Sequence, residues 1–130
     1  MGYDVEIILM RQTASYLATP ILVIGPRGDL IFFNEPAEPL LGMRYDETGE
    51  MPFEQWSPLL VPTYDDGSIV PLEENPLTIA VQQRRPDHKE LWIDGLDGTR
   101  RRLAITAFPL IGQHERRLGA AAIFWLDRTE

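Results

Sequence analysis

The residues that could do chemistry are few in this chain of 130 residues, and they do not form a catalytic pattern. The absence of cysteine excludes a thiolate nucleophile, a disulfide and a thiolate metal site. Ser68 lacks the glycine spacing of a nucleophile elbow. His88 and His114 show no ligand spacing, so we interpret each as an exposed strand-end or loop residue. We therefore predict that the protein is not an enzyme, with no catalytic residue and no metal site.

Two pairs of adjacent, identical carboxylates each have a structural explanation. Asp65 and Asp66 lie in a predicted solvated turn, whereas Glu73 and Glu74 open a predicted helix, whose N-terminal end favours negative charge. No glycine-rich loop stands between a strand and a long helix, which excludes the usual phosphate-binding loop. A small enzyme with a cone-shaped α+β cavity stays an alternative, although we can assign no carboxylate or histidine to its interior.

Length and composition predict one soluble domain with one hydrophobic core. The net charge of −8 argues against nucleic acid as a partner, because phosphate binding requires a concentrated positive field. No apolar run approaches the ~18 residues of a membrane span. The N-terminus also lacks a signal-peptide pattern. We therefore expect a cytoplasmic protein that binds neither nucleic acid nor a membrane.

Residues 21–42 are expected to hold two strands, the turn between them and a short helix. The runs 21–24 and 30–33 are rich in β-branched and aromatic residues, and Pro26 with Gly28 suits a tight turn. Asn34 follows the second run, where its side-chain oxygen is expected to cap the free N–H groups of a short helix.

Residues 3–17 predict an amphipathic helix that ends before Pro20. Two apolar faces lie side by side on it, and one of them has the alternating spacing of four and three that is typical of a short coiled coil. We expect this helix to form a homodimer; the alternative is a single helix that lies on its own domain. The dimer seam comprises Tyr3, Ile7, Met10, Ala14 and Leu17, and the second face Val5, Ile8, Leu9 and Tyr16.

The second half of the chain predicts one helix and three strands. Four prolines between residues 52 and 71 leave room only for short helical turns, and a helix is expected at 76–83. Strands at 89–94 and 100–108 flank an Asp-Gly turn, and a last strand follows at 118–126. Because the last strand is apolar on both sides, both faces of the sheet must be covered.

This order of elements resembles a PAS domain, the small sensor module of bacterial signalling proteins. The resemblance covers residues 21–130 and includes Asp127 and Thr129, which are similar to the Asp-x-Thr that connects many PAS domains to an output helix. It implies an α+β fold with a five-stranded antiparallel sheet, short helices on one face and an N-terminal leading helix. Residues 1–19 would form that helix and residues 20–130 the PAS-like domain.

The resemblance further implies a sensory or regulatory function in signal transduction. A small ligand or a protein partner would bind between the central helix and the sheet, and Asp127 and Thr129 would relay the change to a kinase, cyclase or transcription regulator, as in two-component histidine kinases. The alternative is a ligand-free module for homodimerisation. Residues expected to line the pocket, or simply to fill the core, are Val23, Ile31, Phe33, Leu41, Phe53, Trp56, Leu77, Ala80, Val81, Leu103, Ile105, Ala107 and Ile123.

Cofactor classes of PAS domains can be compared with the residues present. Domains that form a flavin photoadduct or carry coumarate need a cysteine, which this chain lacks. Haem-binding PAS domains commonly use a histidine on or near the central helix, and residues 76–83 contain none. A noncovalently held flavin, a small organic ligand or an empty, packed core stays open, and the sequence requires no cofactor.

Overall fold

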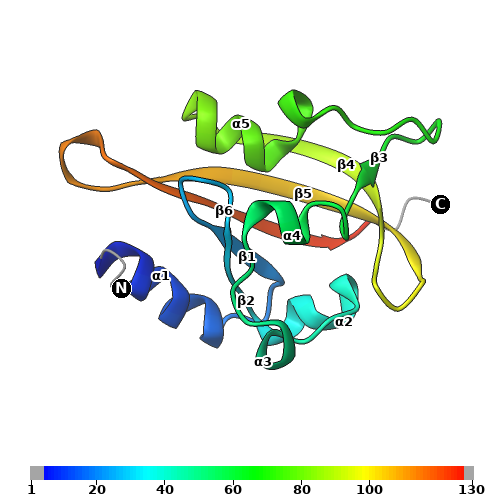
Figure 1. The fold of residues 1–130 in the computed structure, drawn as a ribbon, viewed down its shortest axis with the longest axis horizontal. Coiled ribbons are helices and arrows are strands. Elements are labelled where there is room, and N and C mark those ends of the chain that lie inside the picture. The colour runs from blue at the N-terminus through cyan, green and yellow to red at the C-terminus, as the bar shows by residue number, and fades with distance from the viewer. Residues whose placement is uncertain (1–4, 128–130) are drawn as a thin grey trace.

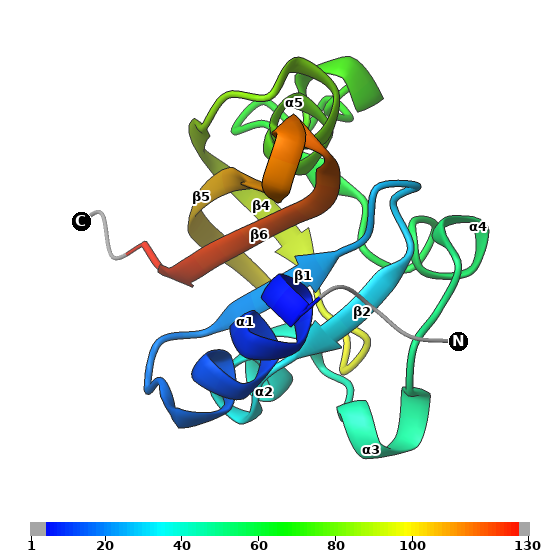
Figure 2. The ribbon, with the colours of Figure 1, turned by 90° about the vertical axis from the view of Figure 1, so that its left-hand side faces the viewer.

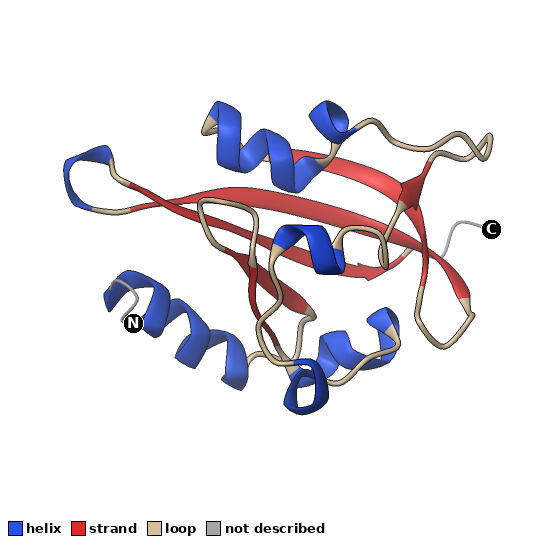
Figure 3. Ribbon diagram, viewed as in Figure 1, coloured by secondary structure: helices blue, strands red, loops and turns tan. Residues whose placement is uncertain are grey.

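The structure, a computed structural model, describes residues 5–127 as a twisted antiparallel sheet with helices on both faces (Figures 1 and 3). In chain order the elements are α1 (Val5–Tyr16), β1 (Ile21–Ile24), β2 (Leu30–Phe33), η1 (Glu35–Ala37), α2 (Glu38–Leu41), α3 (Tyr45–Thr48), α4 (Phe53–Trp56), β3 (Pro62–Thr63), η2 (Leu72–Glu74), α5 (Pro76–Gln83), β4 (Asp87–Asp94), β5 (Arg100–Ile111), η3 (Gln113–Glu115) and β6 (Arg117–Leu126).

The sheet has six strands in the order β2-β1-β6-β5-β4-β3, so the first and last strands of the chain are neighbours. The five-stranded expectation is corrected by β3, whose residues Pro62 and Thr63 pair with Ile93 and Trp92 of β4. Two residues are too few to give a strand pattern in the sequence. Proline is tolerated here because β3 is an edge strand, where no neighbour needs its missing N–H.

Helices cover opposite faces of this sheet. Figures 1 and 2 show α5 on one side of the strands and α1 on the other. Asn75 starts α5 by accepting a hydrogen bond from the Leu77 N–H at 3.0 Å, and Pro76 occupies its first turn. Within the described residues, no helix is both long and apolar enough to cross a membrane.

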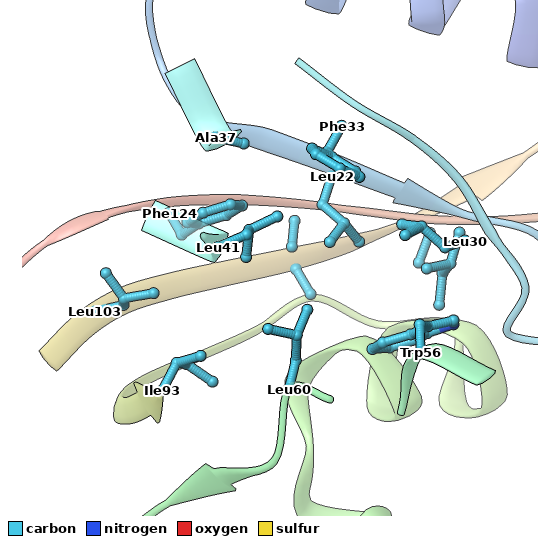
Figure 4. Packing of buried hydrophobic residues seen from close by; sticks show 14 of the residues in the cluster. Leu22, Leu30, Phe33, Ala37, Leu41, Trp56, Leu60, Ile93, Leu103 and Phe124 are labelled. Carbon is cyan, nitrogen blue, oxygen red and sulfur yellow. The ribbon is translucent and has the colours of Figure 1, made fainter. Parts of the chain in front are cut away.

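The larger hydrophobic cluster, called here the inner core, lies between the sheet and the elements that cover this face, which include α2, α4 and α5. Figure 4 shows Leu22, Leu103 and Phe124 of the strands on one side, with Leu60 and Trp56 facing them. Its buried members are Leu22, Ile24, Leu30, Phe33, Ala37, Leu41, Met43, Met51, Trp56, Leu60, Ala80, Val81, Ile93, Leu103, Ala107, Ala120, Ala122 and Phe124.

A second cluster, called here the outer core, joins α1 to the opposite face of the sheet. Ile7 and Ala14 of α1 are 3% and 0% exposed in it. Helix α1 therefore covers β1, β2 and part of β6 on this face, whereas Trp125 and Leu126 at the end of β6 stay 41% and 42% exposed. The buried members of the outer core are Ile7, Ala14, Ile21, Val23, Ile31, Leu118 and Ala121.

The predicted dimer seam is occupied within the chain. Ile7 and Ala14 face the sheet, and Met10 packs against the same cluster. Leu17 lies beyond the end of α1 and is exposed, and Tyr3 lies outside the described residues. In this arrangement the chain's own sheet covers the seam, because the apolar seam of α1 packs on the apolar outer face of the sheet. The homodimer itself stays a prediction.

Asn34 has a different role from the predicted helix cap. Its side chain makes no capping hydrogen bond to η1. Instead, its Oδ1 accepts from the Ile21 N–H at 3.0 Å, and its Nδ2 donates to the carbonyls of Ala14 at 3.0 Å and Thr19 at 2.9 Å. The amide thus ties the end of α1 to the start of β1.

Candidate ligand-binding site

A cavity of about 480 Å³ lies where α4, α5 and the β1–β2 turn meet. Its buried walls are apolar and include Ile24, Trp56, Leu60, Val70 and Val81. A volume of this size falls within the range of pockets that hold small organic ligands. The apolar walls indicate that such a ligand would bind by burying a hydrophobic body.

A second, smaller space of about 60 Å³ continues toward the sheet. Five residues line both spaces and lie between them: Trp56, Leu60, Pro62, Asn75 and Leu77. The deeper walls come from the strands, among them Leu103 and Phe124. Movement of the separating side chains would join the two spaces into one.

Trp56 is held by two contacts of its indole ring. Its Nε1–H donates to the Gly28 carbonyl at 2.8 Å, which connects α4 to the β1–β2 turn. The Phe53 ring packs edge-on against it with the ring centres 5.7 Å apart. Two walls of the cavity are therefore held together by one side chain.

Polar groups gather at the mouth of the cavity. Arg27 of the β1–β2 turn, Gln82 of α5 and Arg117 of β6 are exposed and line it. Ser57 and Thr78 supply hydroxyl groups to the same lining. The site thus combines an apolar interior with a hydrogen-bonding entrance, which is the usual composition of a small-molecule site.

Ten of the predicted pocket residues lie on the inner side of the sheet, although only seven line a cavity. Phe33, Ala80 and Ala107 belong to the inner core without lining either space. The larger cavity is lined by Phe53, Trp56, Leu77 and Val81, and the smaller one by Leu41, Trp56, Leu77, Leu103 and Ile105.

Three predicted pocket residues face the other side of the sheet: Val23, Ile31 and Ile123 pack in or against the outer core beneath α1. Strand β1 is buried along its whole length, so its apolar pattern does not tell which face meets the cavity. The pairing register between β1 and β2 shifts between Val23 and Ile24 of β1. This irregularity places Leu30 of β2, rather than Ile31, on the inner side of the sheet.

Sequence reasoning missed several lining residues. The sequence of the β1–β2 segment predicts only a tight turn, yet Pro26 and Arg27 line the cavity. Val70 and Asn75 also contribute, from the proline-interrupted segment and the start of α5. A positive side chain at the tip of a glycine- and proline-containing turn was the one available signal.

The end of β6 is joined to the rest of the sheet by charged side chains. Arg102 of β5 pairs with Asp127, and the Asp127 N–H donates to the Arg102 carbonyl at 2.9 Å. The same guanidinium contacts Asp65 at 3.0 Å, and the Trp92 indole donates to Asp65 at 2.8 Å. Hydrogen bonds from Arg102 and then Trp92 lower the pKa of Asp65 below its ordinary value. Thr129, the other predicted relay residue, lies outside the described residues.

One chain of polar side chains lies outside the cavity. His88 Nδ1 is 2.6 Å from Thr106 Oγ1, and His88 Nε2 contacts the Glu90 carboxylate. All three side chains lie on the face of β4 and β5 away from the cavity, and none of them lines it. Within residues 5–127, no cluster of histidine and acidic side chains is arranged to hold a metal ion.

Solved structures similar to this chain include several PAS domains. One from a protein of Colwellia psychrerythraea is 19% identical, with a TM-score of 0.64 over 93% of this chain and 97% of that one. The PAS domain of nitrogen regulation protein NR(II) from Vibrio parahaemolyticus is 19% identical, with a TM-score of 0.64 over 92% and 98% of the two chains. The PAS domain of the fruit-fly ELK potassium channel is 6% identical, with a TM-score of 0.72 over 95% and 98%.

These likenesses confirm the predicted PAS fold, an antiparallel sheet with several short helices. No family model matches the sequence, and no curated protein matches it.

Proposed function

We propose that this chain, which has the PAS fold, is a sensory module that binds a small organic ligand in the cavity between α4, α5 and the β1–β2 turn. The observation that carries the proposal is the cavity of about 480 Å³, with buried apolar walls and a polar mouth. The ligand is held without a covalent bond to sulfur, since the chain has no cysteine. A haem ligand is not part of the proposal, because neither His88 nor His114 lines the cavity.

The relay in this proposal uses β6. Arg117 at the start of β6 lines the cavity, and Asp127 follows its end, so the strand connects the cavity to the point where an output segment would begin. A second connection runs through Pro62, which lines the cavity, to Asp65 and then to Arg102. Ligand binding changes this arrangement only to the extent that the ligand prefers one conformation. The output would be a kinase, a cyclase or a transcription regulator.

Filling the cavity tests the proposal. We expect Thr78→Trp to reduce binding of the neutral fluorescent probe N-phenyl-1-naphthylamine by at least about tenfold, because Thr78 lines the cavity from α5. Native mass spectrometry and visible absorption of freshly purified protein would show whether a natural ligand is retained by the wild type and lost in the variant.

The control is Gln83→Trp, which places the same bulk on an exposed residue of α5 that does not line the cavity. This variant should bind the probe like the wild type. A wild-type protein that binds no probe and carries no ligand would contradict the proposal, as would probe binding that Thr78→Trp leaves unchanged.

A homodimer through α1 is a second proposal, carried by a separate observation. The outward side of α1 exposes Val5, Ile8 and Leu9 by 65%, 45% and 55%. Adjacent exposed apolar side chains on a helix are typical of an interface. This surface is the second apolar face of the helix, not the predicted seam.

We expect the wild type to sediment as a dimer and the double variant Ile8→Glu, Leu9→Glu to sediment as a folded monomer. Charge on the outward side of α1 would prevent association without disturbing the outer core. The matched control is Ile69→Glu, Leu96→Glu, which charges two exposed apolar residues outside α1, 67% and 45% exposed. An unchanged dimer in the α1 variant, or a monomeric wild type, would rule out this interface.

A further inference from the structure

The charged side chains at the cavity mouth are positive, whereas the chain as a whole carries a net negative charge. The chain has 20 acidic and 12 basic residues. The cavity lining nevertheless includes two arginines, Arg27 and Arg117, and no aspartate or glutamate. The entrance is therefore a positive site on an acidic protein, and it favours ligands of negative charge.

Arg27 has a guanidinium group that is available to a ligand. The residue is exposed, and no hydrogen bond or ion pair within residues 5–127 uses its side chain. Asp29, the acid nearest to Arg27 in the sequence, does not line the cavity. Its carboxylate lies beside Gly25, since a Cβ placed on Gly25 would lie 2.5 Å from its Oδ1. The turn that carries Arg27 is held in place by the hydrogen bond from Trp56 to Gly28.

Arg117 reaches the same mouth from β6. Its guanidinium donates to the Gln82 carbonyl of α5 at 3.3 Å, which directs the side chain toward the end of that helix. Because a guanidinium has five N–H donors, this single contact leaves donors for an anion. None of the ion pairs among the described residues involves Arg117.

We propose that the cavity takes an amphipathic organic anion, a small molecule with an apolar body and a carboxylate, phosphate or sulfonate group. This inference rests on the proposed function and adds the chemical class of the ligand. The body lies against Trp56, Leu60 and Val81, and the anionic group lies at the mouth between Arg27 and Arg117. Guanidinium groups suit this role because their planar donor pairs match the oxygens of such anions.

A matched pair of fluorescent probes separates charge from shape. 1-Anilinonaphthalene-8-sulfonate and N-phenyl-1-naphthylamine share one aromatic body, and only the first carries a sulfonate. We expect the wild type to bind the anionic probe about tenfold more tightly, which corresponds to two partly exposed charge contacts. Added salt should weaken binding of the anionic probe and leave the neutral probe unaffected.

Variants then assign the preference to the two arginines. Arg27→Gln, Arg117→Gln should abolish the preference for the anionic probe and retain the affinity for the neutral one. The control Arg44→Gln, Arg85→Gln removes the same charge from residues that do not line the cavity, and it should retain the preference.

The possible failures have different meanings. Equal affinity of the wild type for both probes, or a preference that the Arg27 and Arg117 variant retains, would overturn the anion inference and leave the cavity intact. Loss of the preference in the Arg44 and Arg85 variant would also overturn it, since net charge alone would then explain the effect. Binding of neither probe would overturn the proposed function together with this inference.

Discussion

Replacing Asn34 by alanine is expected to lower the free energy of unfolding by about 3 kcal/mol, because the change removes three hydrogen bonds, and within the described residues only the Ala14 carbonyl keeps another partner, the Leu17 N–H. Asn34 is 1% exposed and is the buried polar residue of the described core. Its amide bonds the Ile21 N–H and the carbonyls of Ala14 and Thr19. Each orphaned buried group costs roughly 1–3 kcal/mol, and entry of water at the partly buried Thr19 carbonyl relieves part of this.

Urea unfolding measures the loss, and hydrogen exchange locates it. Protection should fall first in α1, since Asn34 holds the end of that helix. Asn75→Ala is the matched control, because its side chain makes one capping bond, to the Leu77 N–H, and its loss should cost about 1 kcal/mol. If the Asn34 variant were no less stable than the Asn75 variant, the anchoring of α1 by Asn34 would be refuted.

Asn34 also shows where local sequence patterns reach their limit. Its position between a strand and Pro36 is typical of a helix cap, and η1 does begin directly after it. The partners of its side chain come from residues 13 to 20 positions earlier in the chain. Capping rules describe neighbours within a few residues, so a bond to a helix packed from the other side of the sheet has no local signature.

Elements delimited by turn residues were predictable. Strands β1 and β2 have the predicted bounds, because Pro26 and Gly28 separate two short β-branched and aromatic runs. Helix α5 begins at Pro76 as predicted, because proline favours the first turn of a helix. It ends at Gln83, where Arg84 takes the left-handed conformation two residues before Pro86. Such breakers act on the backbone of their own neighbours, and their effect can be inferred without tertiary structure.

The candidate site was predictable only where one face of a strand or helix differs from the other. On β5, Leu103, Ile105 and Ala107 alternate with other residues and lie on the inner side as predicted. Strand β6 is apolar on both sides, and Phe124 rather than Ile123 belongs to the inner core. The arginines at the mouth come from segments 90 positions apart, and only the fold brings them together.

Replacing Gly119 by alanine is expected to destabilise the protein by about 4 kcal/mol or more, because β1 and β6 could no longer lie at their present separation. Gly119 has a φ of +133°, a conformation that residues with a side chain rarely adopt. A Cβ built on it would lie 1.9 Å from the Ile24 carbonyl oxygen and 2.9 Å from Gly25 Cα. Both are backbone atoms at the end of β1, which cannot turn aside as a flexible side chain does.

A loss of this size approaches the whole stability of a small domain, so the variant is expected to be largely unfolded or to unfold at much lower urea concentration. Gly67→Ala is the matched control: it also has a positive φ, +87°, but a Cβ there meets nothing within 4 Å. It should cost about 1 kcal/mol from backbone strain alone. The difference between the two variants isolates the contact between β1 and β6. Equal destabilisation would mean that the end of β1 does not approach Gly119 as closely as described, and the connection from the cavity along β6 would lose its structural basis.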